Sequence, residues 1–158
     1  MKILAISDTH GKLNKVRDIW PKLTDIDMIL HAGDFIADAE KLQAELGVPV
    51  IGVKGNCDGG YSSSDFRVIP VECGNILLTH GHMENVNYQL NGLMYKAMEN
   101  DCRAVVFGHT HKAMTDESNG IRFINPGSLT QPRDGSDGSY AIIRTSADSF
   151  DASIVYYS

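Results

Sequence analysis

Five short apolar runs recur along the chain, and each is followed at once by polar residues. The first extends from Lys2 to Ser7 and is apolar throughout its middle, as expected of a strand that is buried on both faces. The other four end at Ala32, Lys54, Thr79 and Phe107. Each has the length of a strand rather than of a helix, so the pattern predicts strands with polar loops at their carboxyl ends.

Helical periodicity separates the first three of these runs. The segment Gly11–Trp20 places its apolar side chains on one face and is followed by Pro21. The segment Ala37–Leu46 does the same ahead of Gly47, a residue type at which helices commonly stop. Strands and helices therefore alternate here, which predicts a parallel sheet with right-handed crossovers and a binding site outside the carboxyl ends of its strands.

The second half of the chain carries one more helical pattern, over Val86–Asn100, and several hairpin signals. One expected strand is Arg67–Cys73, joined by a tight turn at Gly74 and Asn75 to the run that ends at Thr79. A hairpin is expected over Lys112–Ile124, turning at Ser118-Asn119-Gly120, and a last hairpin pairs Ser139–Thr145 with Ala152–Tyr157. We therefore expect one domain over residues 1–158 with an α/β (α+β) fold. Its architecture would be a four-layer αββα sandwich, with two mixed β-sheets packed face to face, helices outside and a metal site at the carboxyl ends of the strands.

The residues that follow the five apolar runs offer the oxygen and nitrogen donors that divalent metals favour. They are Asp8, His10, Asp34, Asn56, His80, His109 and His111. Each one alone could be a turn residue or a surface histidine, but their recurrence at five strand ends favours a metal site. His31 falls inside its own strand, and we expect it to be a hydrogen-bonded histidine of the core.

Composition narrows the functional classes. The formal net charge is −6 with no basic run, which argues against stable nucleic-acid binding. A small phosphate substrate is still compatible, because two divalent ions outweigh the two aspartates that would bind them. The three cysteines form no CxxC pair and are expected to be free thiols in a reducing compartment. No apolar run is long enough to span a membrane and no signal pattern opens the chain, so we expect a cytoplasmic protein without membrane association.

Six spaced motifs resemble those of a known family. In chain order they are Asp8-Thr9-His10, Gly33-Asp34, Gly55-Asn56-Cys57-Asp58, His80-Gly81-His82, Gly108-His109-Thr110-His111 and Asn125-Pro126-Gly127-Ser128. Together they resemble the calcineurin-like metallophosphoesterase superfamily, and the short chain with its GNCD motif is similar to the small phosphodiesterase branch of the YfcE type.

This resemblance implies two divalent metal ions bridged by Asp34. One ion would be held by Asp8, His10, Asp34 and His111, and the other by Asp34, Asn56, His80 and His109. A metal-bridging hydroxide would attack a phosphodiester in line, with Asp34, Asn56, His80 and His109 at the catalytic centre. Nitrogen and oxygen donors suit several metals, among which Mn²⁺ or Ni²⁺ is favoured and Fe, Co and Zn are alternatives.

The chain departs from many superfamily members at Cys57, where they carry a histidine thought to protonate the leaving oxygen. A thiol is a poor replacement acid at its usual pKa. We therefore expect either a preference for good leaving groups or a proton drawn from metal-bound water or His82. Asp58 is expected to orient the ligands by hydrogen bonding.

Two other interpretations share this sequence pattern. A phosphomonoesterase or nucleotide pyrophosphohydrolase could use the same site, and a non-catalytic binding module resembling a retromer subunit could use the same fold. The expected partner is a small phosphate-ester substrate. Homo-oligomerisation is left open.

Overall fold

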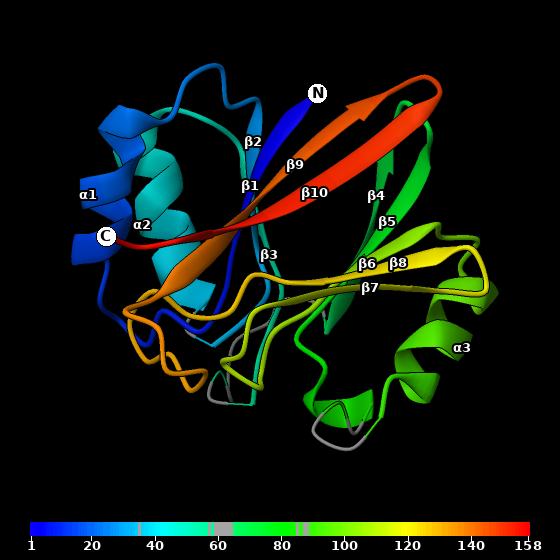
Figure 1. The fold of residues 1–158 in the computed structure, drawn as a ribbon. Coiled ribbons are helices and arrows are strands. Elements are labelled where there is room, and N and C mark those ends of the chain that lie inside the picture. The colour runs from blue at the N-terminus through cyan, green and yellow to red at the C-terminus, as the bar shows by residue number, and fades with distance from the viewer. Residues whose placement is uncertain (35, 57, 59–64, 85, 87–88) are drawn as a thin grey trace.

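The computed structural model describes residues 1–34, 36–56, 58, 65–84, 86 and 89–158. These residues form ten strands and three α-helices (Figure 1). Strands and helices alternate in the first part of the chain, and most of the second part consists of hairpins. The helices are α1 (Asn14–Ile19), α2 (Ile36–Leu46) and α3 (Asn91–Glu99), and short 3-10 helices cover Trp20–Lys22 and His82–Glu84.

The first sheet contains both ends of the chain. Its strand order is β10-β9-β1-β2-β3. The parallel strands are β1 (Lys2–Ile6), β2 (Met28–His31) and β3 (Val50–Gly52), and the antiparallel pair is β9 (Ser139–Ser146) and β10 (Ser149–Tyr156). Ile3 is paired with Met28 on one side and with Ile143 on the other, so β1 lies at the centre of the sheet.

The second sheet is also mixed and has the order β4-β5-β6-β8-β7. Its strands are β4 (Phe66–Val71), β5 (Gly74–Thr79), β6 (Ala104–Val106), β7 (Met114–Ser118) and β8 (Ile121–Asn125). Strand β6 runs parallel to both β5 and β8, while β4 and β7 form antiparallel edges. The β7–β8 hairpin turns at Asn119 and Gly120, whose φ values of 52° and 75° are those that a two-residue hairpin turn needs.

Alternating side chains of each sheet face two different apolar cores. Ile3 and Ala5 point toward the second sheet and pack with residues such as Leu78 and Val106. Leu4 and Ile6 point the other way, into a core shared with α1 and α2. A third core lies between the second sheet and α3. Three cores separate four layers, and Figure 1 shows α1 and α2 outside one sheet and α3 outside the other, which confirms the predicted sandwich.

Several boundaries differ from the prediction; β10, for example, begins at Ser149 rather than Ala152. Helix α1 begins at Asn14 rather than Gly11, because Gly11 has a φ of +79° and its N–H is bound by Asp38. Helix α3 begins at Asn91 rather than Val86, after the 3-10 turn that starts at His82. The β4–β5 turn lies at Glu72 and Cys73, since Gly74 already pairs with Val71. Apolar periodicity locates a helix face but says little about its first turn.

The carboxyl ends of β1, β2, β3, β5 and β6 lie at one edge of the sandwich, at the bottom of Figure 1. The loops that leave these strands therefore converge where the two sheets meet. Among the helices of the described residues, none has the length and apolar character needed to cross a membrane.

Candidate metal centre

Backbone conformation sets the site residues apart from the rest of the chain. Five of them have left-handed φ values: Asp8 (56°), His10 (49°), Asp34 (55°), His109 (70°) and His111 (58°). Residues other than glycine seldom adopt this conformation, and it concentrates at functional sites because the surrounding structure must stabilise it. Here the left-handed residues lie in the loops that follow β1, β2 and β6.

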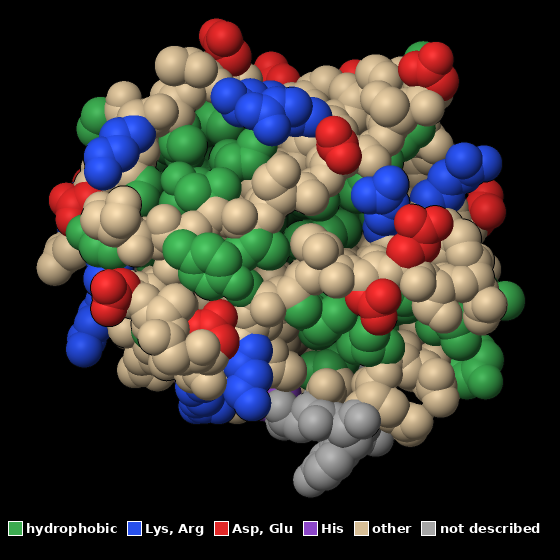
Figure 2. All heavy atoms as spheres, viewed as in Figure 1, with side chains coloured by type: hydrophobic (Ala, Val, Ile, Leu, Met, Phe, Trp, Pro, Cys, Tyr) green, Lys and Arg blue, Asp and Glu red, His purple; other side chains and the backbone are tan. Residues whose placement is uncertain are grey.

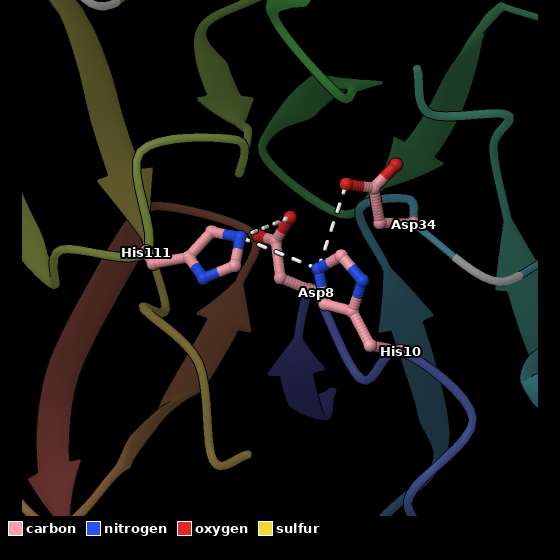
Figure 3. A group of neighbouring side chains, drawn as sticks. All are labelled: Asp8, His10, Asp34 and His111. Atoms are coloured by element: carbon pink, nitrogen blue, oxygen red, sulfur yellow. Dashed lines mark hydrogen bonds and ion pairs between the residues drawn. The ribbon is translucent and has the colours of Figure 1, made fainter. Parts of the chain in front are cut away.

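Four of the predicted ligands form one compact group. Asp8, His10, Asp34 and His111 each offer a donor atom, and these atoms lie within 4.8 Å of one another (Figure 3). His111 Nε2 lies 3.3 Å from Asp8 Oδ1, and His10 Nε2 lies 3.6 Å from Asp34 Oδ2. The two imidazoles face each other, with 3.4 Å between their Nε2 atoms. Two carboxylates and two imidazoles around one small space are a donor set that suits a divalent cation.

One oxygen of Asp8 supports this interpretation. Asp8 is fully buried, and its Oδ2 accepts hydrogen bonds from Ser7 Oγ at 2.6 Å and from the His109 N–H at 3.1 Å. Among the described residues its Oδ1 has no hydrogen-bond partner, and it faces the imidazoles of His111 and His80, the latter at 3.7 Å. A buried carboxylate oxygen without a donor is costly, and a bound cation would remove that cost. The residues present therefore fit a metal ion.

The other predicted ligands adjoin this group through Asp34. His80 Nε2 lies 3.5 Å from Asp34 Oδ2, and His109 Nδ1 lies 3.3 Å from His80 Nε2. The side-chain amide of Asn56 reaches both histidines, at 2.9 Å from His80 Nε2 and 3.3 Å from His109 Nδ1. All seven residues proposed from the sequence are thus brought to one place.

Backbone carbonyls orient two of the imidazoles. His80 Nδ1 donates to the carbonyl of Ala32, and His111 Nδ1 donates to that of Gln131, each at 2.7 Å. With the proton on Nδ1, the Nε2 lone pair of each ring points into the centre, as in metal sites whose histidines are held by outer hydrogen bonds. Close packing maintains this arrangement, because a Cβ on Gly33 would lie only 2.6 Å from His80 Nδ1.

The electrostatics of the site are dominated by its carboxylates. Burial disfavours the charged form of His80, yet the hydrogen bond with Asp34 and the charge of Asp8 outweigh it and raise the pKa of His80 above its ordinary value. The pKa of His111 is raised in the same way, since attraction to the Asp8 carboxylate outweighs burial. Two nearby negative charges that stabilise protons would also attract a divalent cation.

A buried polar network of Thr9, His31 and Asp38 lies behind the loops that carry the ligands, and the sequence predicted only part of it. His31 is fully buried, as expected of a core histidine; its Nδ1 accepts from the Gly33 N–H at 3.2 Å, and its Nε2 lies 2.9 Å from Thr9 Oγ1. Thr9 in turn donates to Asp38 Oδ2 at 2.5 Å. Asp38, in the first turn of α2, was not predicted, although an acid at a helix start is a recognisable signal.

The remaining candidates lie around the centre. The ring of His82 is 5.3 Å from that of His80 and 6.2 Å from that of His109, measured between centroids. Asp58 is buried and its Oδ2 accepts from the Gly55 N–H at 2.9 Å, so it fixes the loop that carries Asn56. Cys57 lies outside the described residues. The other two cysteines, Cys73 and Cys102, have free thiols as expected.

The fold and the site together define a class of phosphoesterase. The model of the calcineurin-like phosphoesterase superfamily domain matches residues 1–148. The chain therefore belongs to this superfamily, which confirms the resemblance seen in the sequence motifs.

Individual relatives agree with this assignment. The chain is 32% identical over 158 residues to the probable metallophosphoesterase YsnB of Bacillus subtilis, covering 99% of this chain and 90% of YsnB. It is 27% identical to the phosphodiesterase YfcE of Escherichia coli, covering 90% of this chain and 87% of YfcE. The prediction of a metal-dependent phosphoesterase is confirmed by these matches.

Solved structures share the fold. A predicted phosphoesterase from Streptococcus pneumoniae superposes with a TM-score of 0.83 at 26% identity, over 99% of this chain and 89% of that one. Wild-type Vps29 of Entamoeba histolytica, crystallised with zinc, superposes with a TM-score of 0.78 at 23% identity over the whole of both chains. The likeness to Vps29 concerns the fold alone.

Proposed function

We propose that this protein is a phosphodiesterase that works with two divalent metal ions. The observation that carries the proposal is the central position of Asp34, whose Oδ2 lies 3.6 Å from His10 Nε2 and 3.5 Å from His80 Nε2. One carboxylate oxygen thus faces a donor from each half of the site. In dinuclear phosphoesterase sites a shared carboxylate is what holds two ions close together.

Two sets of side chains would hold the ions. The first set is Asp8, His10, Asp34 and His111, and the second is Asp34, Asn56, His80 and His109. Mn²⁺ or Ni²⁺ is the proposed pair, because the donors are imidazole, carboxylate and amide without a thiolate among the described ligands. The chemistry that such ions supply is Lewis acidity toward phosphoryl oxygens and activation of a water molecule for in-line attack on phosphorus.

The protein's own residues contribute position and charge. The hydrogen bonds from His80 and His111 to backbone carbonyls fix both rings before substrate arrives, so no reorganisation is needed at the reacting phosphate. The Asp8 carboxylate is likewise fixed before substrate binds, by hydrogen bonds from Ser7 Oγ and the His109 N–H. His82, beside the rings of His80 and His109, is the proposed donor of a proton to the leaving oxygen.

The proposed preference for a diester rests on the relatives. YfcE is named a phosphodiesterase. A phosphomonoesterase or pyrophosphohydrolase would use the same ligands, so only turnover separates these activities. A binding module of this fold has no need of seven donors on one centre, which is why we favour an enzyme.

The test is hydrolysis of bis-p-nitrophenyl phosphate against p-nitrophenyl phosphate by chelated protein resupplied with Mn²⁺ or Ni²⁺. Metal content per chain is measured in parallel. Asp34→Asn should lose bound metal and slow diester hydrolysis at least about a hundredfold, because several kcal/mol of transition-state stabilisation depend on the ions. Asp25→Asn is the matched control, since Asp25 is an exposed aspartate with a similar φ of 58°.

Each result has a distinct meaning. Metal-dependent diester turnover that collapses only in Asp34→Asn supports the proposal. Faster turnover of the monoester would assign the site to a phosphatase instead. If neither ester is hydrolysed although metal binds, the binding-module interpretation replaces ours.

A further inference from the structure

A cavity of about 460 Å³ opens beside the candidate metal centre and has no role in the proposed mechanism. Its walls are formed by Val86, Thr110, Lys112, Met114 and Arg133. This volume falls within the usual range for sites that bind small molecules. The lining combines two cations with two apolar side chains, a mixture suited to an anionic group attached to an apolar or ring-shaped body.

The cavity and the metal centre share the same loops. Thr110 lies between the proposed ligands His109 and His111, so the wall of the cavity begins one residue from each. On the opposite side, the N–H of Arg133 donates to the carbonyl of His111 at 2.9 Å. One substituent of a substrate bound at the metal centre would therefore be long enough to reach this cavity.

The charge of Lys112 and Arg133 is available to a ligand. Some exposed cations of this chain are held by carboxylates, such as Arg17 by Glu45 at 2.9 Å and Arg122 by Glu117 at 3.2 Å. Within the part of the chain that the structure describes, Lys112 makes no ion pair. The same holds for Arg133, and both side chains are exposed. In a protein with a net charge of −6, two such cations on one cavity rim make that rim locally positive.

Hydrogen bonds hold the two sides of the rim together. Asp134 Oδ2 accepts from the Ala113 N–H at 3.2 Å, and Asp134 Oδ1 accepts from Ser136 Oγ at 2.6 Å. The one carboxylate adjacent to Arg133 in the chain is thus engaged by the loop itself. Thr110 Oγ1 accepts from the Lys112 N–H at 3.2 Å and from Asn125 Nδ2 at 3.0 Å, which fixes the other side. The rim is formed before a ligand arrives.

On the face drawn in Figure 2, Lys and Arg side chains gather next to a histidine at the lower edge of the molecule. The parallel strands end at this same edge in Figure 1. The rest of this face mixes both signs of charge. Positive charge beside a metal centre focuses anions toward it.

We propose that this cavity binds a second anionic group of the substrate, so that the preferred substrate is a phosphate ester with an additional phosphate or carboxylate. Lys112 and Arg133 contact the second anion, and Val86 with Met114 contact the body that joins the two groups. The inference rests on the proposed function, because it presumes that the first phosphate binds at the metal centre.

The test compares thymidine 3′,5′-bisphosphate with thymidine 5′-monophosphate, which differ only in the second phosphate. Both are measured with the metal-loaded protein, as inhibitors of bis-p-nitrophenyl phosphate hydrolysis and by calorimetric Kd. We expect the bisphosphate to bind about tenfold more tightly at low salt, with most of that preference lost at high salt, since partly exposed charge pairs are weak and screened.

Lys112→Met and Arg133→Met should each raise the Kd of the bisphosphate about threefold to fivefold, and that of the monophosphate by less than about twofold. Lys22→Met is the matched control, because Lys22 is an exposed lysine in the 3-10 helix beyond α1, away from the strand ends. It should change neither Kd. Circular dichroism of each variant checks that the fold is retained.

Equal Kd values for the two nucleotides would overturn the inference, and so would variants that weaken both nucleotides equally. These results leave the proposed function intact if bis-p-nitrophenyl phosphate is still hydrolysed. Absence of hydrolysis together with a retained preference for the bisphosphate would instead refute the phosphodiesterase activity and support an anion site at this cavity.

Discussion

Replacing Thr9 by valine tests whether the buried network behind the metal loops is needed for their conformation. Thr9 is buried, lies between Asp8 and His10, and its hydroxyl joins His31 to Asp38. Because His31 Nδ1 accepts from the Gly33 N–H, its proton is on Nε2 and points at Thr9. Valine keeps the shape of threonine but offers neither an acceptor to His31 nor a donor to Asp38.

The magnitude follows from the groups left behind. An unsatisfied buried N–H costs about 1–3 kcal/mol, and a hydrogen bond to a charged group contributes about 1.5–3 kcal/mol. Asp38 keeps its hydrogen bond from the Gly11 N–H at 2.9 Å, so the sum is reduced. We expect Thr9→Val to lower the free energy of unfolding by about 2–4 kcal/mol, and the Tm by roughly 5–12 °C for a chain of this size.

Urea unfolding followed by circular dichroism measures this loss, with Thr9→Ser as the control. Serine keeps the hydroxyl and removes one buried methyl, so it should cost about 1 kcal/mol. Calorimetric titration with Mn²⁺ gives the second readout: the affinity should fall about 10-fold to 100-fold in the valine variant only, as for other residues that orient ligands. If valine costs no more than serine in both measurements, the network does not support the site.

Three further predictions concern other parts of the molecule. Phe107→Ala removes a fully buried ring from the core beneath α3 and should lower the free energy of unfolding by about 3–5 kcal/mol in urea; a loss below about 1.5 kcal/mol would mean that this core relaxes around the gap. Gly33→Ala places a Cβ 2.6 Å from His80 Nδ1, at a residue whose φ is +100°. The purified variant should therefore contain less metal than the wild type, as measured by elemental analysis. An unchanged metal content would contradict the close approach. Hydrogen bonds from Thr145 and from the amino terminus lower the pKa of Glu72 from 4.5 to about 2, so its carboxylate stabilises the folded state above pH 4.5 and loses this effect as the pH falls toward 2. Glu72→Gln should therefore be less stable than the wild type at pH 7, with a difference in Tm that narrows through this window, whereas a constant difference would exclude the ionised carboxylate as its source.

The sequence by itself determined most of the fold. Short continuous apolar runs located the central strands, and apolar residues with period 3.6 located the helices, because this spacing decides which side chains can share a buried face. The Asn119-Gly120 pair likewise located its hairpin, since its turn requires positive φ at both residues. The sequence located helix starts less well, and Gly11 and Val86 lie outside α1 and α3. Those starts depend on contacts such as that between Gly11 and Asp38, which are 27 residues apart.

The seven candidate ligands were also predicted from the sequence alone, by their recurrence after strands. Which of them share a metal ion could not be read from strand ends, and the division into two ligand sets remains a proposal supported by the distances around Asp34. The sequence did not indicate that Thr9, His31 and Asp38 form one network, because nothing in the local pattern relates a loop, a strand and a helix start. That relation arises only when β1, β2 and α2 pack together.

The tertiary structure alone decided how the two sheets face each other and what lies where they meet. Asp8 from the first sheet meets His80 and His111 from the second, over separations of 72 and 103 residues in the chain. Local propensity acts over a few residues, whereas these contacts are fixed by the shared core of Ile3, Ala5, Leu78 and Val106. The cavity beside Lys112 and Arg133 arises in the same way, because its two walls come from loops that become neighbours only after the strands on either side have been paired.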